Sequence, residues 1–294
     1  MIIIDMNQTL ISTLMAQIGS NPNAEISEDL IRHMVLTTVL HYKRKFAIDY
    51  GNLVFAADDK NYWRKDIFPY YKAGRKKSRD KSGFNWKLIF DCLNKIRDEL
   101  REHFPYKVIQ VPRAEADDII ATLCKFTQEN LISNVLDDSK EPVLIISGDK
   151  DFMQLQKYDN VAQYSPMQKK FLKTDHPDLF LKEHIIRGDE GDGVPNFLSD
   201  DDTFVVDTKR QTPIRQVKLD VWLSQPPEAF CETPEMLTKY ERNRKLIDLS
   251  NVPVEVEQAI INEYKAPIRG DRSELFNYFI KNRLRYLLED IGEF

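Results

Sequence analysis

Acidic residues gather in three short blocks, at 115–118, 149–151 and 189–192, separated by long stretches of ordinary sequence. Carboxylates held close together repel one another, so blocks that converge in the fold need a cation to neutralise them. The five histidines lie outside these blocks and the three cysteines show no CxxC spacing. Because oxygen-only sites suit hard cations, the blocks predict magnesium, with manganese as a substitute, rather than zinc.

A strongly basic stretch accompanies these acids, although the whole chain has a net charge of -5. Residues 60–81 contain nine lysines and arginines against two aspartates, and aromatic residues are interleaved with them. This mixture is typical of a surface that neutralises phosphates and stacks on bases. A solvated helix with a few buried rings is the alternative, and the predicted metal site favours the nucleic-acid interpretation.

Short apolar strands place several of the acids. Residues 2–5, 53–58 and 143–147 read as strands that each run out into a carboxylate, and helical patterns lie between them, from Ser27 onwards and over 89–100. Strands that alternate with helices predict a parallel sheet, whose ligands collect at the carboxyl ends of the strands. We therefore expect Asp5, Asp58, Asp149 and Asp151 to converge. Turn or helix-cap roles are the alternative for each aspartate.

The acids of the block at 115–118 are Glu115, Asp117 and Asp118, and they lie at the start of a helix that follows an apolar strand at 108–111. Glu115 and Asp118 share a helix face, and capping competes with metal binding as their role.

The second half of the chain reads as helices over 181–186, 212–223, 253–264 and 275–291. We therefore divide the chain into an α/β domain, 1–180, and a smaller helical domain, 181–294. The last helix, with Phe276, Phe279 and Ile280, is expected to pack in the core, and a free docking peptide at the C-terminus is the alternative. No apolar run is long enough to cross a membrane and no signal peptide precedes the first strand, so a cytoplasmic protein without membrane contact is expected.

Longer motifs around the acids resemble those of the structure-specific 5′-nuclease, or flap endonuclease, family. They are Ala-Glu-Ala-Asp-Asp-Ile-Ile-Ala at 114–121, Ile-Ser-Gly-Asp-Lys-Asp-Phe at 146–152 and Gly-Asp-Glu-Gly-Asp-Gly-Val-Pro at 188–195, together with the basic stretch near 63–75. The resemblance runs from residue 2 to the end of the chain. It implies a mainly parallel central sheet flanked by helices, of the 5′-nuclease or PIN-like kind, and a C-terminal all-helical domain with a helix-turn-helix variant.

The resemblance also implies roles for individual residues. Two Mg²⁺ ions, or Mn²⁺ in their place, would be held by acids at matching positions: Asp5, Asp58, Glu115, Asp117, Asp118, Asp149, Asp151 and Asp192. Lys72 and Arg64 would offset charge on the scissile phosphate, with general backbone binding as the alternative.

For nucleic-acid binding, the resemblance implies that residues 60–83 form an arch, which threads a 5′ strand and becomes ordered mainly on substrate. Tyr71 would stack on the terminal base. Cations of the arch would bind the strand: Arg75, Lys76, Lys77 and Arg79. An acidic loop at 198–203 would repel phosphates in the helical domain, and a helix beginning at Thr212, flanked by Lys209, Arg210 and Arg215, would restore a phosphate site.

The function that follows is a magnesium-dependent 5′ to 3′ exonuclease and flap endonuclease, which acts on RNA–DNA and DNA–DNA duplexes and removes RNA primers from lagging-strand fragments. The expected ligand is a branched or 5′-ended duplex, bound by a monomer in the cytoplasm of a phage-infected bacterium. A sliding clamp or a single-strand-binding protein is a further candidate partner. The alternatives are an inactive nucleic-acid-binding module and a PIN-type nuclease of single-stranded RNA.

Overall fold

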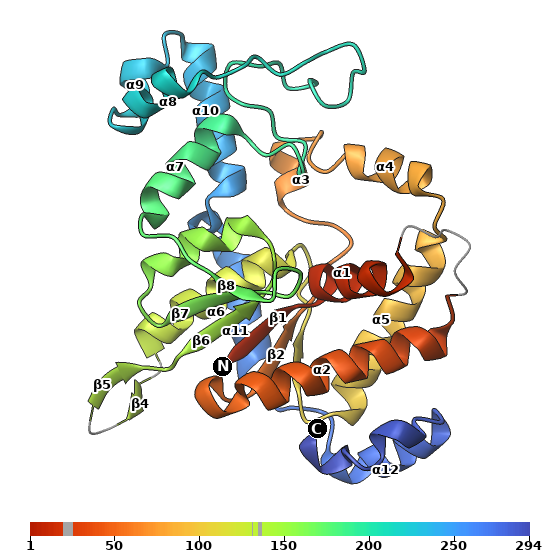
Figure 1. Cartoon of the computed structure of the whole chain (residues 1–294). Coiled ribbons are helices and arrows are strands. Elements are labelled where there is room, and N and C mark those ends of the chain that lie inside the picture. The colour runs from red at the N-terminus through yellow and green to blue at the C-terminus, as the bar shows by residue number, and fades with distance from the viewer. Residues whose placement is uncertain (20–25, 131, 135–136) are drawn as a thin grey trace.

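The computed structural model describes residues 1–19, 26–130, 132–134 and 137–294 (Figure 1). Its centre is a six-stranded sheet with the order β3-β2-β1-β6-β7-β8, in which β8 alone pairs antiparallel. The strands are β1 Ile2–Asp5, β2 Leu53–Ala56, β3 Lys107–Ile109, β6 Val143–Ile146, β7 Val161–Ser165 and β8 Lys170–Leu172. A separate antiparallel pair consists of β4 Ile132–Asn134 and β5 Asp137–Lys140. The predicted mainly parallel sheet is confirmed; β7, β8 and the β4–β5 pair were not predicted.

Every residue of β1, β2 and β6 is buried, because helices cover both faces of the sheet. Ile2 and Ile4 belong to one hydrophobic core and Ile3 to another, as the two-residue period of a strand requires. The first core lies under α1 Met6–Ile18, α2 Glu28–Tyr50 and α5 Trp86–His103. The second lies under α6 Ala116–Asn130 and α11 Val254–Lys265.

The two helices predicted between the first strands are confirmed. Ser27 caps α2 by accepting a hydrogen bond from the backbone N–H of Leu30 at 3.2 Å. The apolar stripe of α5 is fully buried against the sheet, at Ile89, Leu93, Ile96 and Leu100.

A third core lies away from the sheet and is built by α7 Pro177–Arg187, α8 Gln216–Leu223, α9 Pro227–Phe230 and α10 Pro234–Ile247. Phe68 and Tyr71, from the base of the arch, complete it. The prediction of a helix starting at Thr212 is wrong, because α8 begins only at Gln216. Pro213 disfavours helical backbone at the residue before it, and the N–H of Thr212 instead donates to Ser199 Oγ at 2.8 Å.

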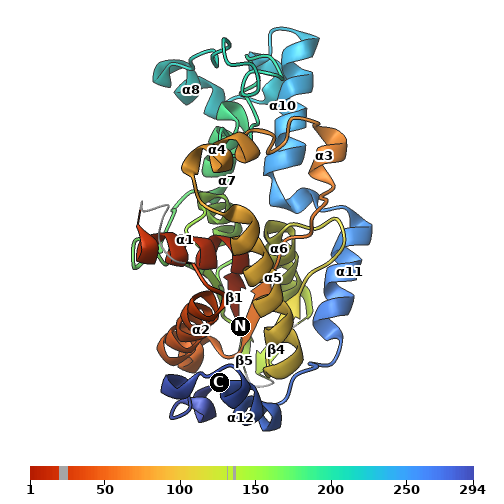
Figure 2. The ribbon, with the colours of Figure 1, turned by 90° about the vertical axis from the view of Figure 1, so that its right-hand side faces the viewer.

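The last third of the chain returns to the sheet. After α10 come a 3₁₀ turn, η2 Leu249–Asn251, then α11, α12 Arg272–Lys281 and two further 3₁₀ turns, η3 Arg285–Leu287 and η4 Ile291–Glu293. A single helix over 275–291 is therefore wrong: the backbone breaks after Lys281, and Arg283 adopts a φ of 55°. Figure 2 shows α8 and α10 at one end of the molecule and α12 at the other.

The terminal residues are packed rather than free. Phe294 is fully buried against Phe104 and Phe279, and Glu293 forms an ion pair with Arg44. Core packing of this segment is confirmed for Phe279 but is wrong for Phe276 and Ile280, which are 59% and 53% exposed. These two residues lie on the exposed face of α12.

The arch, residues 60–83, contains two short helices, α3 Arg64–Ile67 and α4 Gly74–Ser82. None of the residues of α4 is buried, and the helix stands above the sheet near α1 and α5 (Figure 1). The arch is thus partly helical in this structure. The expectation that it becomes ordered mainly on substrate stays a prediction. Among the described residues, no helix has the length and apolar character needed to cross a membrane.

Candidate active site

Three aspartates that follow parallel strands meet at one edge of the sheet. Asp5 ends β1 and caps α1 by accepting from the N–H of Gln8 at 3.1 Å. Asp58, just beyond β2, accepts from the N–H of Ala116 at 2.7 Å, which ties it to the start of α6. Asp149 follows β6 and caps the 3₁₀ helix η1 Lys150–Lys157. The aspartates therefore converge at the sheet edge, as predicted, and Asp5 and Asp149 also cap helices, which was the alternative role.

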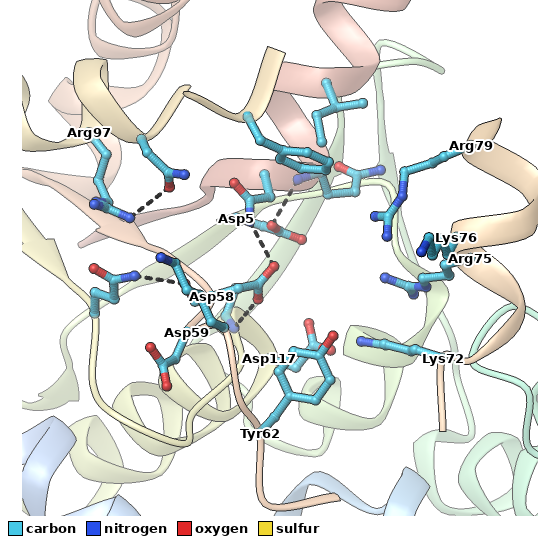
Figure 3. Close-up of a pocket in the computed structure, with 18 of the residues that line it drawn as sticks. Asp5, Asp58, Asp59, Tyr62, Lys72, Arg75, Lys76, Arg79, Arg97 and Asp117 are labelled. Carbon is cyan, nitrogen blue, oxygen red and sulfur yellow. Dashed lines mark hydrogen bonds between the residues drawn. The ribbon is translucent and has the colours of Figure 1, made fainter. Parts of the chain in front are cut away.

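These three carboxylates and Asp117 line one pocket of about 1340 Å³, which we call the acid pocket. Its opposite wall is cationic, with Lys72, Arg75, Lys76 and Arg79 among its lining residues. Figure 3 shows the side chains of α4 extending into the cavity from the side opposite Asp5 and Asp58. One cavity therefore combines a carboxylate floor with a cationic wall.

Asp151 and Asp192 lie behind the floor, in a small adjoining cavity that Asp117 also lines. His184 of α7 separates Asp151 from Asp189, with its Nδ1 3.3 Å from the first and its Nε2 3.0 Å from the second. Sequence reasoning set His184 apart from the acidic blocks and included Asp189 in the block at 189–192 without naming it as a ligand. The one available signal was their five-residue spacing across the end of α7.

Burial and mutual repulsion perturb the pKa values of these acids. Burial, together with the charge of Asp58, raises the pKa of Asp5 to about 7. Burial and the neighbouring Asp149 raise the pKa of Asp151 to about 8. Burial also raises the pKa values of Asp149 and Asp117. These shifts mean that the floor resists holding all its negative charge at neutral pH without a cation.

The hydrogen-bonding pattern fits a hard divalent cation at this floor. Asp151 Oδ1 is buried and makes no hydrogen bond to any described residue. The potential metal ligands around the floor of the acid pocket are carboxylate oxygens, which Mg²⁺ and Mn²⁺ prefer. The imidazole of His184 is already engaged with Asp189. Burial alone would raise the pKa of Asp189, but the interaction with His184 outweighs burial and lowers this pKa to about 2.

Two of the predicted metal ligands, Glu115 and Asp118, are engaged by protein groups. The buried Arg64 guanidinium lies 2.9 Å from Glu115 and 2.8 Å from Asp118, and it also donates to the carbonyl of Leu246. Asp118 accepts from the Trp63 indole at 3.1 Å and from the N–H of Glu115 at 2.9 Å. The second contact is a helix cap at α6, the alternative considered from the sequence.

Arg64 does not line the acid pocket. Its contacts join α3, α6 and the end of α10, so its side chain braces the arch against the sheet. Lys72, by contrast, lines the pocket, pairs with Glu115 and lies 3.4 Å from Asp192. It has a φ of 57° and donates its backbone N–H to the carbonyl of Asp192 at 2.7 Å.

The predicted base-stacking residue, Tyr71, is buried, and its hydroxyl lies 3.1 Å from Glu115 and 2.7 Å from Asp192. Tyr62 is the tyrosine whose ring lines the acid pocket, with the ammonium groups of Lys65 and Lys72 4.5 Å and 5.5 Å from its centroid.

The remaining predicted cations divide into two groups. Ion pairs hold Lys77 to Asp207, and Lys209 to Asp200 and Asp202. Arg242 of α10 also forms an ion pair with Asp201. The negative charge of the acidic loop at 198–203 is therefore largely neutralised by cations of the same chain. Arg210 and Arg215 are exposed on the surface before α8.

Comparison with known proteins decides the family. The profile of the 5′-3′ exonuclease N-terminal resolvase-like domain matches residues 2–183, and that of the T4 RNase H C-terminal region matches residues 176–294. Ribonuclease H of Enterobacteria phage T4 is 31% identical to this chain over 301 residues, covering 99% of this chain and 95% of the relative. The chain belongs to the 5′-3′ exonuclease family. It is therefore a nuclease.

Other proteins resemble the chain either in part of its sequence or in its fold. Flap endonuclease Xni of Shewanella oneidensis is 29% identical over 147 residues, which cover 47% of this chain and 48% of that protein. The phage T5 D15 protein, crystallised with metal ions, superposes with a TM-score of 0.57 at 14% identity, over 90% of this chain and 96% of that one. A complex of T5 D15 flap endonuclease with DNA and metal ions gives a TM-score of 0.58 at 15% identity, over 90% of this chain and 99% of that one.

Proposed function

We propose that this 5′-3′ exonuclease family member is a magnesium-dependent 5′ to 3′ exonuclease and flap endonuclease, acting on RNA–DNA and DNA–DNA duplexes to remove RNA primers during DNA replication. The observation that carries the proposal is the acid pocket, where carboxylates at strand ends face cations of the arch. Phosphodiester cleavage needs both, because the substrate is anionic and charge grows on the scissile phosphate. The likeness to phage T4 ribonuclease H supports the RNA–DNA substrate.

Two Mg²⁺ ions are proposed, held by the acids that reach the floor of the acid pocket and the cavity behind it: Asp5, Asp58, Asp117, Asp149, Asp151, Asp189 and Asp192. Bound there, Mg²⁺ would supply an activated water and stabilise the leaving oxygen. Glu115 and Asp118 are proposed to act indirectly, by fixing Arg64 and Lys72. The Lys72 ammonium is proposed to contact the scissile phosphate from the arch side.

The arch cations Arg75, Lys76 and Arg79 are proposed to bind the strand that carries the 5′ end. Arg210 and Arg215 are proposed to contact the duplex backbone, which carries no sequence information. The setting proposed is a monomer in the cytoplasm of a phage-infected bacterium. Recruitment by a sliding clamp or a single-strand-binding protein is proposed as well.

Cleavage of 5′-labelled substrates tests the proposal. A flap, a nicked duplex, an RNA-primed duplex and single-stranded RNA are compared with Mg²⁺, with EDTA and with the variant Asp149→Asn. We expect oligonucleotide release from the flap and the RNA-primed duplex, none with EDTA, and a loss of at least about a hundredfold in Asp149→Asn. Asp159→Asn, a change at an exposed aspartate away from the pocket, is the matched control and should cleave normally.

The outcomes separate the alternatives. Wild-type rates for Asp149→Asn would contradict the metal assignment. Binding without cleavage of any forked substrate would favour an inactive module, and a preference for single-stranded RNA would favour PIN-type activity.

A further inference from the structure

A second pocket, of about 470 Å³, lies beside the acid pocket, and we call it the outer pocket. It is enclosed by α4, by α1, by the start of α5 and by two loops from the helical half of the chain. The residues that line it come mostly from these elements: Ile11, Tyr70, Gly74, Arg75, Ser78, Arg79, Trp86, Phe90, Glu190, Gly191, Gly193, Phe204 and Val205. Unlike the acid pocket, it is mainly aromatic and aliphatic.

The outer pocket and the acid pocket adjoin beneath α4. Four residues line both cavities: Ile11, Arg75, Arg79 and Phe90. Figure 3 shows Arg75 and Arg79 extending from α4 into the acid pocket. A polymer chain that leaves the acid pocket under α4 would therefore enter the outer pocket directly.

Two of the aromatic side chains of this pocket, Trp86 and Phe90, are in contact with each other. The rings of Trp86 and Phe90 lie 5.8 Å apart at 34°, and the guanidinium of Arg79 lies 5.4 Å from the Phe90 centroid. The Trp86 indole donates to Ser82 Oγ at 2.7 Å, which fixes the ring against the end of α4. Both rings are only partly buried, and Tyr70 is 38% exposed. Partly open rings beside a guanidinium are the usual surface for stacking unpaired bases.

Positive charge around the outer pocket favours an anionic ligand over an apolar peptide. Arg75 forms an ion pair with Asp192, and Glu190 is the one acid among the lining residues. Within the described part of the chain, no carboxylate lies within ion-pair distance of Arg79 or of its neighbour Lys76. The free positive charge is thus on the wall shared with the acid pocket, where phosphates would pass.

We propose that the outer pocket binds unpaired nucleobases of a 5′ single-stranded tail, which stack on Trp86 and Phe90 while Arg79 holds the backbone. The proposal rests on the proposed nuclease function and adds a tail-binding site to it. Substrates with an unpaired tail therefore gain affinity that a nicked duplex does not.

The test measures binding of fluorescent duplexes in EDTA, with no 5′ tail, a tail of about two nucleotides or a tail of about eight. Trp86→Leu and Phe90→Leu keep an apolar side chain but lose the ring, whereas Phe90→Tyr keeps an aromatic ring. Phe276→Leu, at an exposed phenylalanine of α12, is the matched control. We expect the first two variants to lose about tenfold in affinity for the long tail, with little change for the tailless duplex, and Phe90→Tyr and Phe276→Leu to match wild type.

An equal change on all three substrates, or none on any, would overturn the tail-binding site. Cleavage of the nicked duplex with Mg²⁺ is followed in parallel. If the wild-type protein cleaves the nicked duplex but the affinity lost by the ring variants does not depend on the tail, only this inference is contradicted. If the wild-type protein cleaves nothing, the proposed function itself is contradicted.

Discussion

The acidic side chains of the site fall into two classes according to what neutralises them. Asp5 and Asp151 are buried among other carboxylates, and their pKa values rise to about 7 and about 8. Glu115 and Asp118 are also buried but face the Arg64 guanidinium. The first class has little positive charge to balance it, since Asp151 faces only the His184 imidazole at 3.3 Å, and it calls for metal. The second class already has its counter-ion.

Lys72 differs from the other arch lysines because it is held between Glu115 and Asp192 inside the acid pocket. Burial lowers the pKa of this ammonium, but its electrostatic interactions with Tyr71, Asp192 and Glu115 outweigh burial and raise the pKa, so the ammonium stays protonated. We expect Lys72→Ala to lower kcat by about 10²–10³ while substrate affinity changes by less than about tenfold, because the charge is needed mainly as the phosphate becomes more negative. Single-turnover rates and equilibrium binding separate the two effects.

The control for this experiment is Lys76→Ala, which removes an exposed lysine that lines the same pocket. It should weaken binding modestly, in a salt-dependent manner, and leave kcat unchanged. Parallel losses of affinity and rate in Lys72→Ala would assign Lys72 to general backbone binding.

Arg64 should matter for stability more than for phosphate contact. Arg64→Leu would leave Glu115 and Asp118 buried without their guanidinium, which costs about 3–5 kcal/mol. Arg244→Leu breaks an exposed pair with Glu241 and should cost at most about 1 kcal/mol. Urea unfolding of both variants measures the difference. A fully stable Arg64→Leu protein that has lost only kcat would restore the catalytic role implied by the family resemblance.

At the level of elements, the third acidic block depends on how α7 ends. Gly188 follows the helix with a φ of 71°, and a Cβ there would lie 2.3 Å from the carbonyl oxygen of Val194. The turn also pairs Asp189 with Val194 through two backbone hydrogen bonds of 2.7 Å. This closed turn sets where Asp189 and Asp192 point.

Gly188→Ala should therefore disturb both folding and metal binding. We expect a loss of more than about 2 kcal/mol and weaker Mg²⁺ binding, because the backbone must move to relieve the contact with Val194. Gly51→Ala isolates the conformational cost, since Gly51 ends α2 with a φ of 81° but has open space around it. Calorimetry and Mg²⁺ titration of both variants test this. Equal effects in the two variants would show that the φ angle alone matters.

How far sequence predicts these elements depends on the range of the forces that fix them. The strand ends at Asp5, Asp58 and Asp149 were predictable, because a short apolar run and the parallel-sheet rule are local signals. The meeting of His184 with Asp151 was not, since it depends on how α7 packs on η1. The late start of α8 could be predicted in part from Pro213. The hydrogen bond from the N–H of Thr212 to Ser199 could not, because it depends on tertiary structure.

At the scale of the whole molecule, elements from both sides of residue 180 pack together. Helix α7 runs across that point, and α11 and α12 pack on the two cores of the sheet. The third core, between α7 and α10, also contains Phe68 and Tyr71 of the arch base. The arch is thus anchored to the helical half, and movement of either one would be transmitted to Lys72.

The carboxylate floor should make the stability of the metal-free protein fall as pH rises. For unfolded aspartate the reference pKa is 3.8, against about 7 for Asp5 and about 8 for Asp151 in the fold. The folded chain therefore holds protons that the unfolded chain releases, and the free energy of unfolding decreases between these limits. His184, whose pKa is also raised, contributes with the same sign. Mg²⁺ binds the deprotonated carboxylates and should oppose this loss.

Thermal unfolding in EDTA and in Mg²⁺, at about pH 5 and about pH 8, measures the effect. We expect the EDTA sample to melt lower at the higher pH, and saturating Mg²⁺ to add about 3 kcal/mol there and much less at the lower pH. Asp151→Asn should flatten the pH dependence, because the neutral amide removes one of the repelling charges, while the exposed control Asp159→Asn should retain the wild-type slope. A melting temperature in EDTA that is independent of pH, or a Mg²⁺ effect of equal size at both pH values, would show that the floor is neutralised without metal.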